Sequence, residues 1–119
     1  MQSEATANPL SPRDWHVLVA LSNECLHGYG IMKAVERDSD GRVTAEVGSL
    51  YRVLDRLLAE GMVEQVAPPT EAPDDTRGRP RRYYGLTDRG RDALTRETLR
   101  LRDAVRLARE RRLLPESSR

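Results

Sequence analysis

Apolar residues in the middle of the chain recur at helical spacing. Between residues 43 and 62 they follow one another at steps of three and four, as Val47, Leu50, Leu54, Leu57 and Leu58. This period is typical of one face of an α-helix and differs from a strand, in which side chains alternate every two residues. Gly61 comes next and indicates a helix C-terminus. We therefore expect a helix over about residues 46–60, with its apolar face toward the core.

The other face of this expected helix carries Ser49, Arg52 and Arg56. A helix that is apolar behind and cationic in front can enter a DNA groove, where hydroxyls contact phosphates and arginines contact guanine edges. Tyr51 is a further candidate, and a place in the core against a hairpin is an equal alternative for it. Two other interpretations stay open: the face is simply solvated, and Arg56 forms an ion pair with Glu60 one turn later.

Two shorter helices are expected before this one. Ser11 is a good N-cap and Pro12 suits the first helical position, so a helix is predicted from there to about Asn23. Glycines then interrupt the pattern. A second helix is predicted over residues 28–37, and its inward-facing residues are expected to be Ile31, Met32 and Val35. The polar cluster at residues 38–41 predicts a turn.

A hairpin and a long helix are expected to follow. Residues 62–66 alternate between apolar and polar, residues 82–86 provide a returning strand, and the proline-rich segment 67–80 predicts an exposed loop between them. Thr87 then caps a helix that is expected to run to about Arg112. That helix carries a weakly apolar seam, formed by Leu94, Leu101, Val105 and Ala108.

This order predicts a mainly α fold with a small β-hairpin. Three helices followed by a hairpin form a winged helix-turn-helix domain, expected over residues 11–86, whose third helix reads DNA. A C-terminal dimerisation helix is expected over residues 87–112. Residues 1–10 and 113–119 are interpreted as flexible tails.

Basic residues also gather in and near the predicted wing. Four of them lie around its tip and its return, at Arg77, Arg79, Arg81 and Arg82. In a winged fold they would enter the minor groove or contact the backbone. The alternative is a solvated loop, in which Asp74 and Asp75 cancel part of the charge. Lys33, on the second helix, is a candidate for contact with a backbone phosphate.

Composition narrows the class of protein only modestly. The net charge is +1 in 119 residues, so no overall basic field indicates nucleic acid, and the positions of the charges decide. The single cysteine, Cys25, cannot form an internal disulfide; we expect a small buried apolar residue there, with a redox sensor as the alternative. No apolar run reaches the roughly 18 residues of a membrane span, and no secretory signal is recognised. A cytoplasmic location is expected.

Nothing in the sequence favours an enzyme, a metal or a cofactor. Tyr29 and Lys33 have a spacing found in some dehydrogenases, but no glycine-rich dinucleotide loop precedes them. His16 and His27 have no carboxylate or cysteine at ligand spacing. No serine, histidine and acid set supports catalysis.

Four short motifs follow one another along the chain. Two of them open the second and third helices, as His27-Gly28-Tyr29-Gly30 and Gly48-Ser49-Leu50-Tyr51. The other two flank the wing, as Leu57 with Glu60-Gly61-Met62-Val63 and Arg82-Tyr83-Tyr84-Gly85-Leu86-Thr87 with Gly90. In this order and at this spacing, the four motifs resemble the PadR family of bacterial transcriptional regulators. The resemblance covers about residues 11–94.

The resemblance implies a homodimer of the short subfamily that represses a palindromic operator and releases it on binding an aromatic or amphipathic effector. Arg52 departs from it, since many members have proline there. The only tryptophan is Trp15, on the first helix, whereas drug-sensing short members carry one on the last helix. An effector cavity lined by Trp15, Leu101 and Val105 is a minority hypothesis. The alternative to a DNA-binding regulator is a winged-helix protein-interaction adaptor or effector sensor without direct DNA readout.

Overall fold

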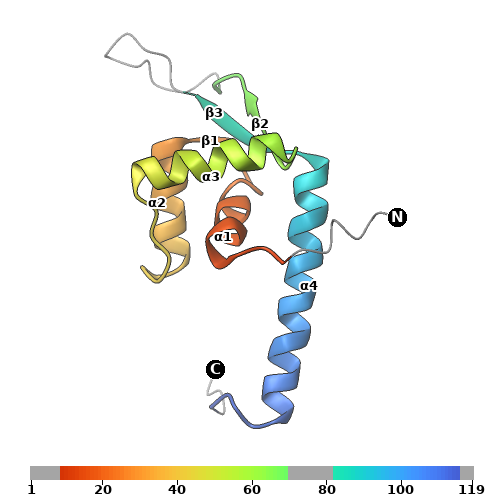
Figure 1. Cartoon of the computed structure of the whole chain (residues 1–119). Coiled ribbons are helices and arrows are strands. Elements are labelled where there is room, and N and C mark those ends of the chain that lie inside the picture. Colours follow the sequence, from red (N-terminus) through yellow and green to blue (C-terminus); the bar gives the residue numbers. More distant parts are fainter. Residues whose placement is uncertain (1–8, 70–81, 116–119) are drawn as a thin grey trace.

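The computed structural model describes residues 9–69 and 82–115. Along the chain, its elements are α1 (Pro12–Ala20), β1 (Leu26–His27), α2 (Gly28–Asp38), α3 (Val47–Ala59), β2 (Val63–Val66), β3 (Tyr83–Leu86) and α4 (Asp88–Glu110). Figure 1 shows α3 lying across α1 and α2, which together form the body of the molecule. The hairpin lies beside α3, and α4 runs down one side. The mainly helical winged fold predicted from the sequence is confirmed.

Side-chain caps determine where the helices begin. The hydroxyl oxygen of Ser11 accepts a hydrogen bond from the Asp14 amide at 3.0 Å, and that of Thr87 accepts one from the Gly90 amide at 2.9 Å. Both caps were expected. The expectation that the first helix reaches Asn23 was wrong: α1 ends at Ala20, and the Ser22 hydroxyl donates to the Val19 carbonyl at 2.6 Å. That side chain satisfies a carbonyl at the helix end and closes the last turn.

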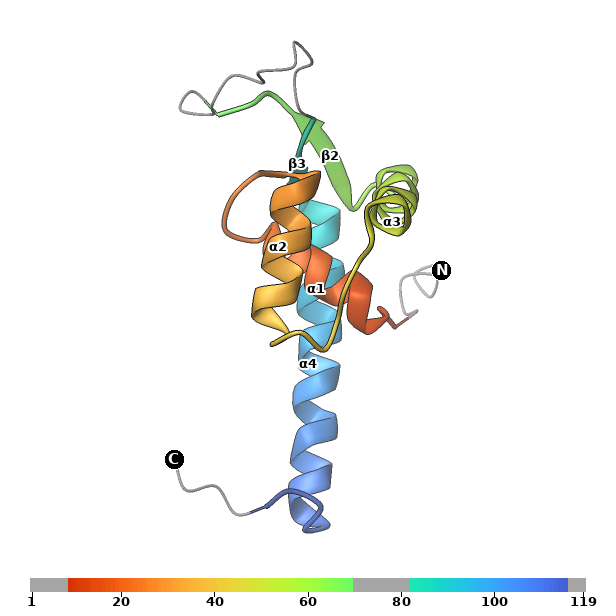
Figure 2. The same cartoon turned by 90° about the vertical axis from the view of Figure 1, so that its left-hand side faces the viewer.

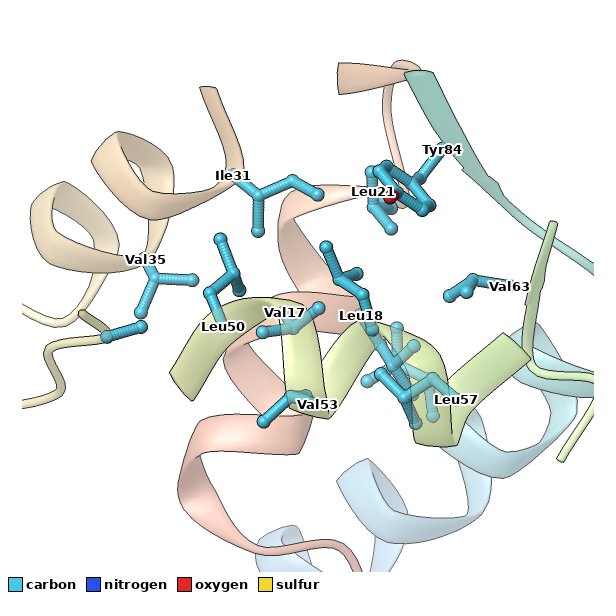
Figure 3. Close-up of a cluster of buried hydrophobic side chains, with 13 residues drawn as sticks. Val17, Leu18, Leu21, Ile31, Val35, Leu50, Val53, Leu57, Val63 and Tyr84 are labelled. Atoms are coloured by element: carbon cyan, nitrogen blue, oxygen red, sulfur yellow. The ribbon is translucent and has the colours of Figure 1, made fainter. Parts of the chain in front are cut away.

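The apolar faces of α1, α2 and α3 meet in one core (Figure 3). On α3 the buried residues are Leu50, Val53, Leu54 and Leu57. The expectation that Val47 joins them was wrong, because its side chain is 57% exposed. Val47 is the first residue of α3, and the core begins one turn later. On α2, Ile31 and Val35 are fully buried and Met32 packs against the cluster, as predicted.

The expected hairpin is present as β2 paired with β3, and β1 extends it to a three-stranded antiparallel sheet in the order β1-β3-β2. β1 pairs Leu26 with Tyr84 and adds an edge that the sequence did not predict. Because β3 is central, Tyr83 and Tyr84 are both buried, and burial raises the pKa of the Tyr84 phenol. Cys25, directly before β1, is exposed, so the expectation of a buried residue there was wrong.

The last helix has two different halves. Its first part packs on α1, and Gly90 lies so close to the hairpin that a Cβ there would overlap the Met62 carbonyl oxygen. The rest projects away from the body in both views (Figures 1 and 2), with Leu101 and Val105 exposed. The helix ends at Glu110, slightly before the expected Arg112. Among the described residues, no helix is long and apolar enough to cross a membrane.

Candidate nucleic-acid interface

The front of α3 is exposed to solvent. Its buried residues hold the helix against α1 and α2, so the opposite side faces outward (Figure 3). On that side Gly48, Tyr51, Arg52 and Asp55 are exposed. Arg52 forms no ion pair with the residues described, so its guanidinium is available to an outside acceptor. One guanidinium can donate two parallel hydrogen bonds to a guanine edge or a phosphate.

Tyr51 is positioned by the first residue of α2. A Cβ built on Gly28 would lie 2.8 Å from Cζ of Tyr51, so the phenol ring needs a glycine at this place. The side chain is 40% exposed. The expected alternative, a core position against the hairpin, was wrong, because the residue is exposed and its ring lies against Gly28 of α2. Two family-like motifs therefore meet here, since Gly28 belongs to one and Tyr51 to the other.

Ser49 lies on the flank of α3 that faces α1. Its hydroxyl oxygen accepts a hydrogen bond from Nη1 of Arg13 at 3.0 Å. Arg13 and Arg42 are exposed and line a hollow of about 550 Å³ beside the start of α3, together with Thr44. Sequence reasoning missed both arginines because they lie outside α3 and the wing. Only the packing of α1 against α3 brings them to the same surface.

Arg56 is held by α1. Its Nη2 donates to both carboxylate oxygens of Asp14, at 2.8 and 3.0 Å, and its Nη1 lies 3.8 Å from Glu60. The ion pair with Glu60 confirms the open alternative, and the pair with Asp14 was not predicted. The hydrogen bond to Asp14 raises the pKa of Arg56, so the guanidinium stays charged. Arg56 thus differs from Arg52 in being committed to a buried carboxylate.

Two of the remaining candidates for DNA contact, Lys33 and Arg82, belong to the described residues. On α2, Lys33 Nζ lies 5.7 Å from the centroid of the exposed Tyr29 ring, a cation–π geometry. Arg82 is exposed directly before β3. The other three wing arginines, Arg77, Arg79 and Arg81, lie outside the described residues.

The three residues suggested for an effector cavity lie on α1 and on α4. Nε1 of Trp15 donates to the Thr98 hydroxyl at 3.0 Å, which ties α1 to the middle of α4. Leu101 and Val105 lie further along α4, exposed to solvent. Over residues 9–69 and 82–115, no group of three or more histidine, cysteine, aspartate or glutamate side chains could hold a metal ion.

Comparison with known proteins places this arrangement in a family. The sequence model described as "Transcriptional regulator PadR-like family" matches residues 17–96. No curated protein sequence matches this one.

Solved structures share the fold at low sequence identity. A PadR family transcription regulator from Clostridium difficile is 21% identical, with a TM-score of 0.66 over 84% of this chain and 97% of that one. A transcriptional regulator from Clostridium thermocellum is 18% identical, with a TM-score of 0.65 over 92% of this chain and 96% of that one. Bacillus subtilis PadR, in complex with operator DNA, is 22% identical, with a TM-score of 0.58 over 74% of this chain and 47% of that one.

Proposed function

Because this chain belongs to the PadR-like family of transcriptional regulators, we propose that it is a dimeric repressor. It binds a palindromic operator through α3 and the wing, and it leaves the operator when a small effector binds. The exposed front of α3 carries this proposal. The similar fold of Bacillus subtilis PadR, which was solved with its operator DNA, supports it.

The roles of the side chains follow from their availability. Arg52, which has no acidic partner among the described residues, reads a base edge in the major groove. Two basic residues contact backbone phosphates beside α3. They are Arg13, which is hydrogen-bonded to Ser49, and Lys33 on α2. Arg82 and the wing arginines extend this contact along the duplex. Arg56 supports α3 through Asp14 and contributes charge rather than base recognition.

The dimer is proposed to form through α4. Thr98, Leu101, Val105 and Ala108 follow the buried Leu94 at helical spacing, so the stripe that packs in the protomer continues beyond it. Exposed apolar residues at this spacing on a projecting helix are typical of an interface with a second helix. A two-fold axis would then present two readers to successive major grooves, about 34 Å apart.

Fluorescence anisotropy with DNA from upstream of the chain's own gene tests the proposal. We expect the affinity to fall steeply with salt, because phosphate contacts release counterions. Arg52→Ala should weaken operator binding by about 1–3 kcal/mol and leave binding to unrelated DNA nearly unchanged. Arg37→Ala, which removes an exposed arginine at the far end of α2, is the matched control. Salt-insensitive binding, or equal losses for the two variants, contradicts the proposal and favours the protein-interaction adaptor.

A further inference from the structure

A hollow of about 380 Å³ lies between the start of α1, the end of α3 and one side of α4. This volume is in the range of pockets that bind small molecules. It lies on a different side of α4 from the proposed dimer stripe, since its α4 residues, Arg89, Ala93, Arg96 and Arg100, follow another row of the helix. None of the three residues first suggested for an effector cavity lines it.

The lining of the hollow has a net positive charge. Four arginines face two carboxylates, Asp14 and Glu60, so the lining carries a formal charge of +2. Arg56 and Arg100 are engaged with acidic residues, at 2.8 Å to Asp14 and 3.0 Å to Glu97 respectively. Arg89 and Arg96 have no acidic partner within the described part of the chain. Two available guanidiniums lining one concave site favour an anion, which they can bind through charge-assisted hydrogen bonds.

The rest of the lining is apolar and suits more than a bare ion. Pro9 and Leu10 enter from the segment before α1, Met62 from the start of the hairpin and Ala93 from α4. A mixed lining of this kind binds a ligand with a charged end and an apolar body. A hydrated inorganic anion would leave the apolar side without a contact.

The hollow shares a wall with the DNA-facing surface. Asp14 and Arg56 line both this hollow and the second one beside the start of α3. An anion that engages Arg56 from the α4 side therefore competes with Asp14. Two contacts attach α3 to α1, the Asp14–Arg56 pair and the hydrogen bond from Arg13 to Ser49. Because Arg13 and Asp14 are neighbours in α1, loosening the Asp14–Arg56 pair disturbs both contacts.

We propose that this hollow binds a small organic anion with an apolar body, and that occupancy weakens the Asp14–Arg56 pair and lowers the affinity of α3 for DNA. The ligand class is that of a medium-chain carboxylate or an alkyl phosphate. The second half of the statement rests on the proposed function, whereas binding itself does not. Differential affinity for two positions of α3 is all that the coupling requires.

Isothermal titration calorimetry on the whole chain, with octanoate, octyl phosphate, octanol and inorganic phosphate, tests the binding. We expect both organic anions to bind at least about tenfold more tightly than octanol or inorganic phosphate, because octanol lacks the charge and inorganic phosphate lacks the apolar body. Arg89→Gln with Arg96→Gln should weaken anion binding at least about tenfold. Arg109→Gln with Arg111→Gln, which removes the same two charges from the exposed end of α4, should leave it unchanged.

The possible outcomes separate the two proposals. Equal binding of octanol, or an unaffected double variant, overturns the site. A double variant that binds no anion but also dissociates into monomers in sedimentation velocity overturns it too, because the hollow then belongs to the contact between copies. Anion binding without any change in operator anisotropy overturns the coupling and keeps the site. Absence of operator binding by the unmodified chain contradicts the proposed function and leaves the calorimetric result standing.

Discussion

Asp14 and Arg56 form a pair whose members have very different surroundings. Asp14 is only 7% exposed, whereas the side chain of Arg56 is 46% exposed. Removing the arginine leaves a buried carboxylate without its cation, and removing the charge of the aspartate leaves a guanidinium that can turn to water and to Glu60.

We therefore predict that Arg56→Met costs about 3 kcal/mol of the free energy of unfolding, and Asp14→Asn only about 1 kcal/mol. Urea denaturation at one fixed protein concentration measures both, because a dimer's stability depends on concentration. Arg52→Met, the same change on the exposed front of α3, is the control and should lie within about 0.5 kcal/mol of the unmodified chain. Equal losses for the two paired residues would show that Asp14 is better solvated than its burial indicates.

Single residues also mark the limit of sequence reasoning. The spacing of apolar residues identified Leu50, Leu54 and Leu57 as core, because helical period alone determines which side they share. It placed Val47 with them wrongly, since where a core ends along a helix depends on the neighbouring elements. The pairing of Asp14 with Arg56 joins residues 42 positions apart and has no local signal.

At the scale of elements, long periodic segments and capped helix starts could be predicted, and short pairings could not. The starts of α1 and α4 follow from Ser11 and Thr87, whose hydroxyls have an obvious local role. β1 has two residues, too few for any alternation to be visible, and it exists only because β3 offers an edge. The sequence likewise named Arg52 and Ser49 for the candidate interface, whereas Arg13 and Arg42 come to the same surface only through the packing of α1 against α3.

The projecting half of α4 gives a prediction for that element. Leu101→Glu with Val105→Glu should convert the proposed dimer into a monomer, because two carboxylates would be buried against the partner helix. Far-UV circular dichroism should change little, since both side chains are exposed in the protomer. Sedimentation velocity measures the mass of the particle and so distinguishes the monomer from the dimer.

Thr95→Glu, also on α4 but outside the stripe, is the control and should remain dimeric. A dimer that survives the double change would move the interface elsewhere on the molecule.

The whole molecule is elongated, with extents of 55 × 42 × 25 Å. A 23-residue helix spans about 35 Å, and much of α4 extends past the body that carries the reader (Figure 2). In the proposed two-fold assembly through α4, the two α4 helices would hold the two α3 helices at a fixed separation.

We predict that inserting five base pairs, about half a helical turn, between the operator's half-sites lowers affinity to that of one half-site, because the second reader then meets the wrong face of the duplex. Anisotropy with the two DNA duplexes, and with a single half-site as the reference, measures this. Unchanged affinity for the lengthened operator would mean that the two reader domains move independently.

The close approach at Gly90 has a consequence for how such a protein can diversify. Because the Met62 carbonyl leaves no room for a larger residue there, the angle between α4 and the wing is fixed at a single joint. In an assembly through α4, that angle sets how far apart the two wings stand. If the proposed dimer is correct, the spacing of the half-sites would be determined where the hairpin meets the last helix. Substitutions on α3 would then change which bases are chosen while that spacing stays the same.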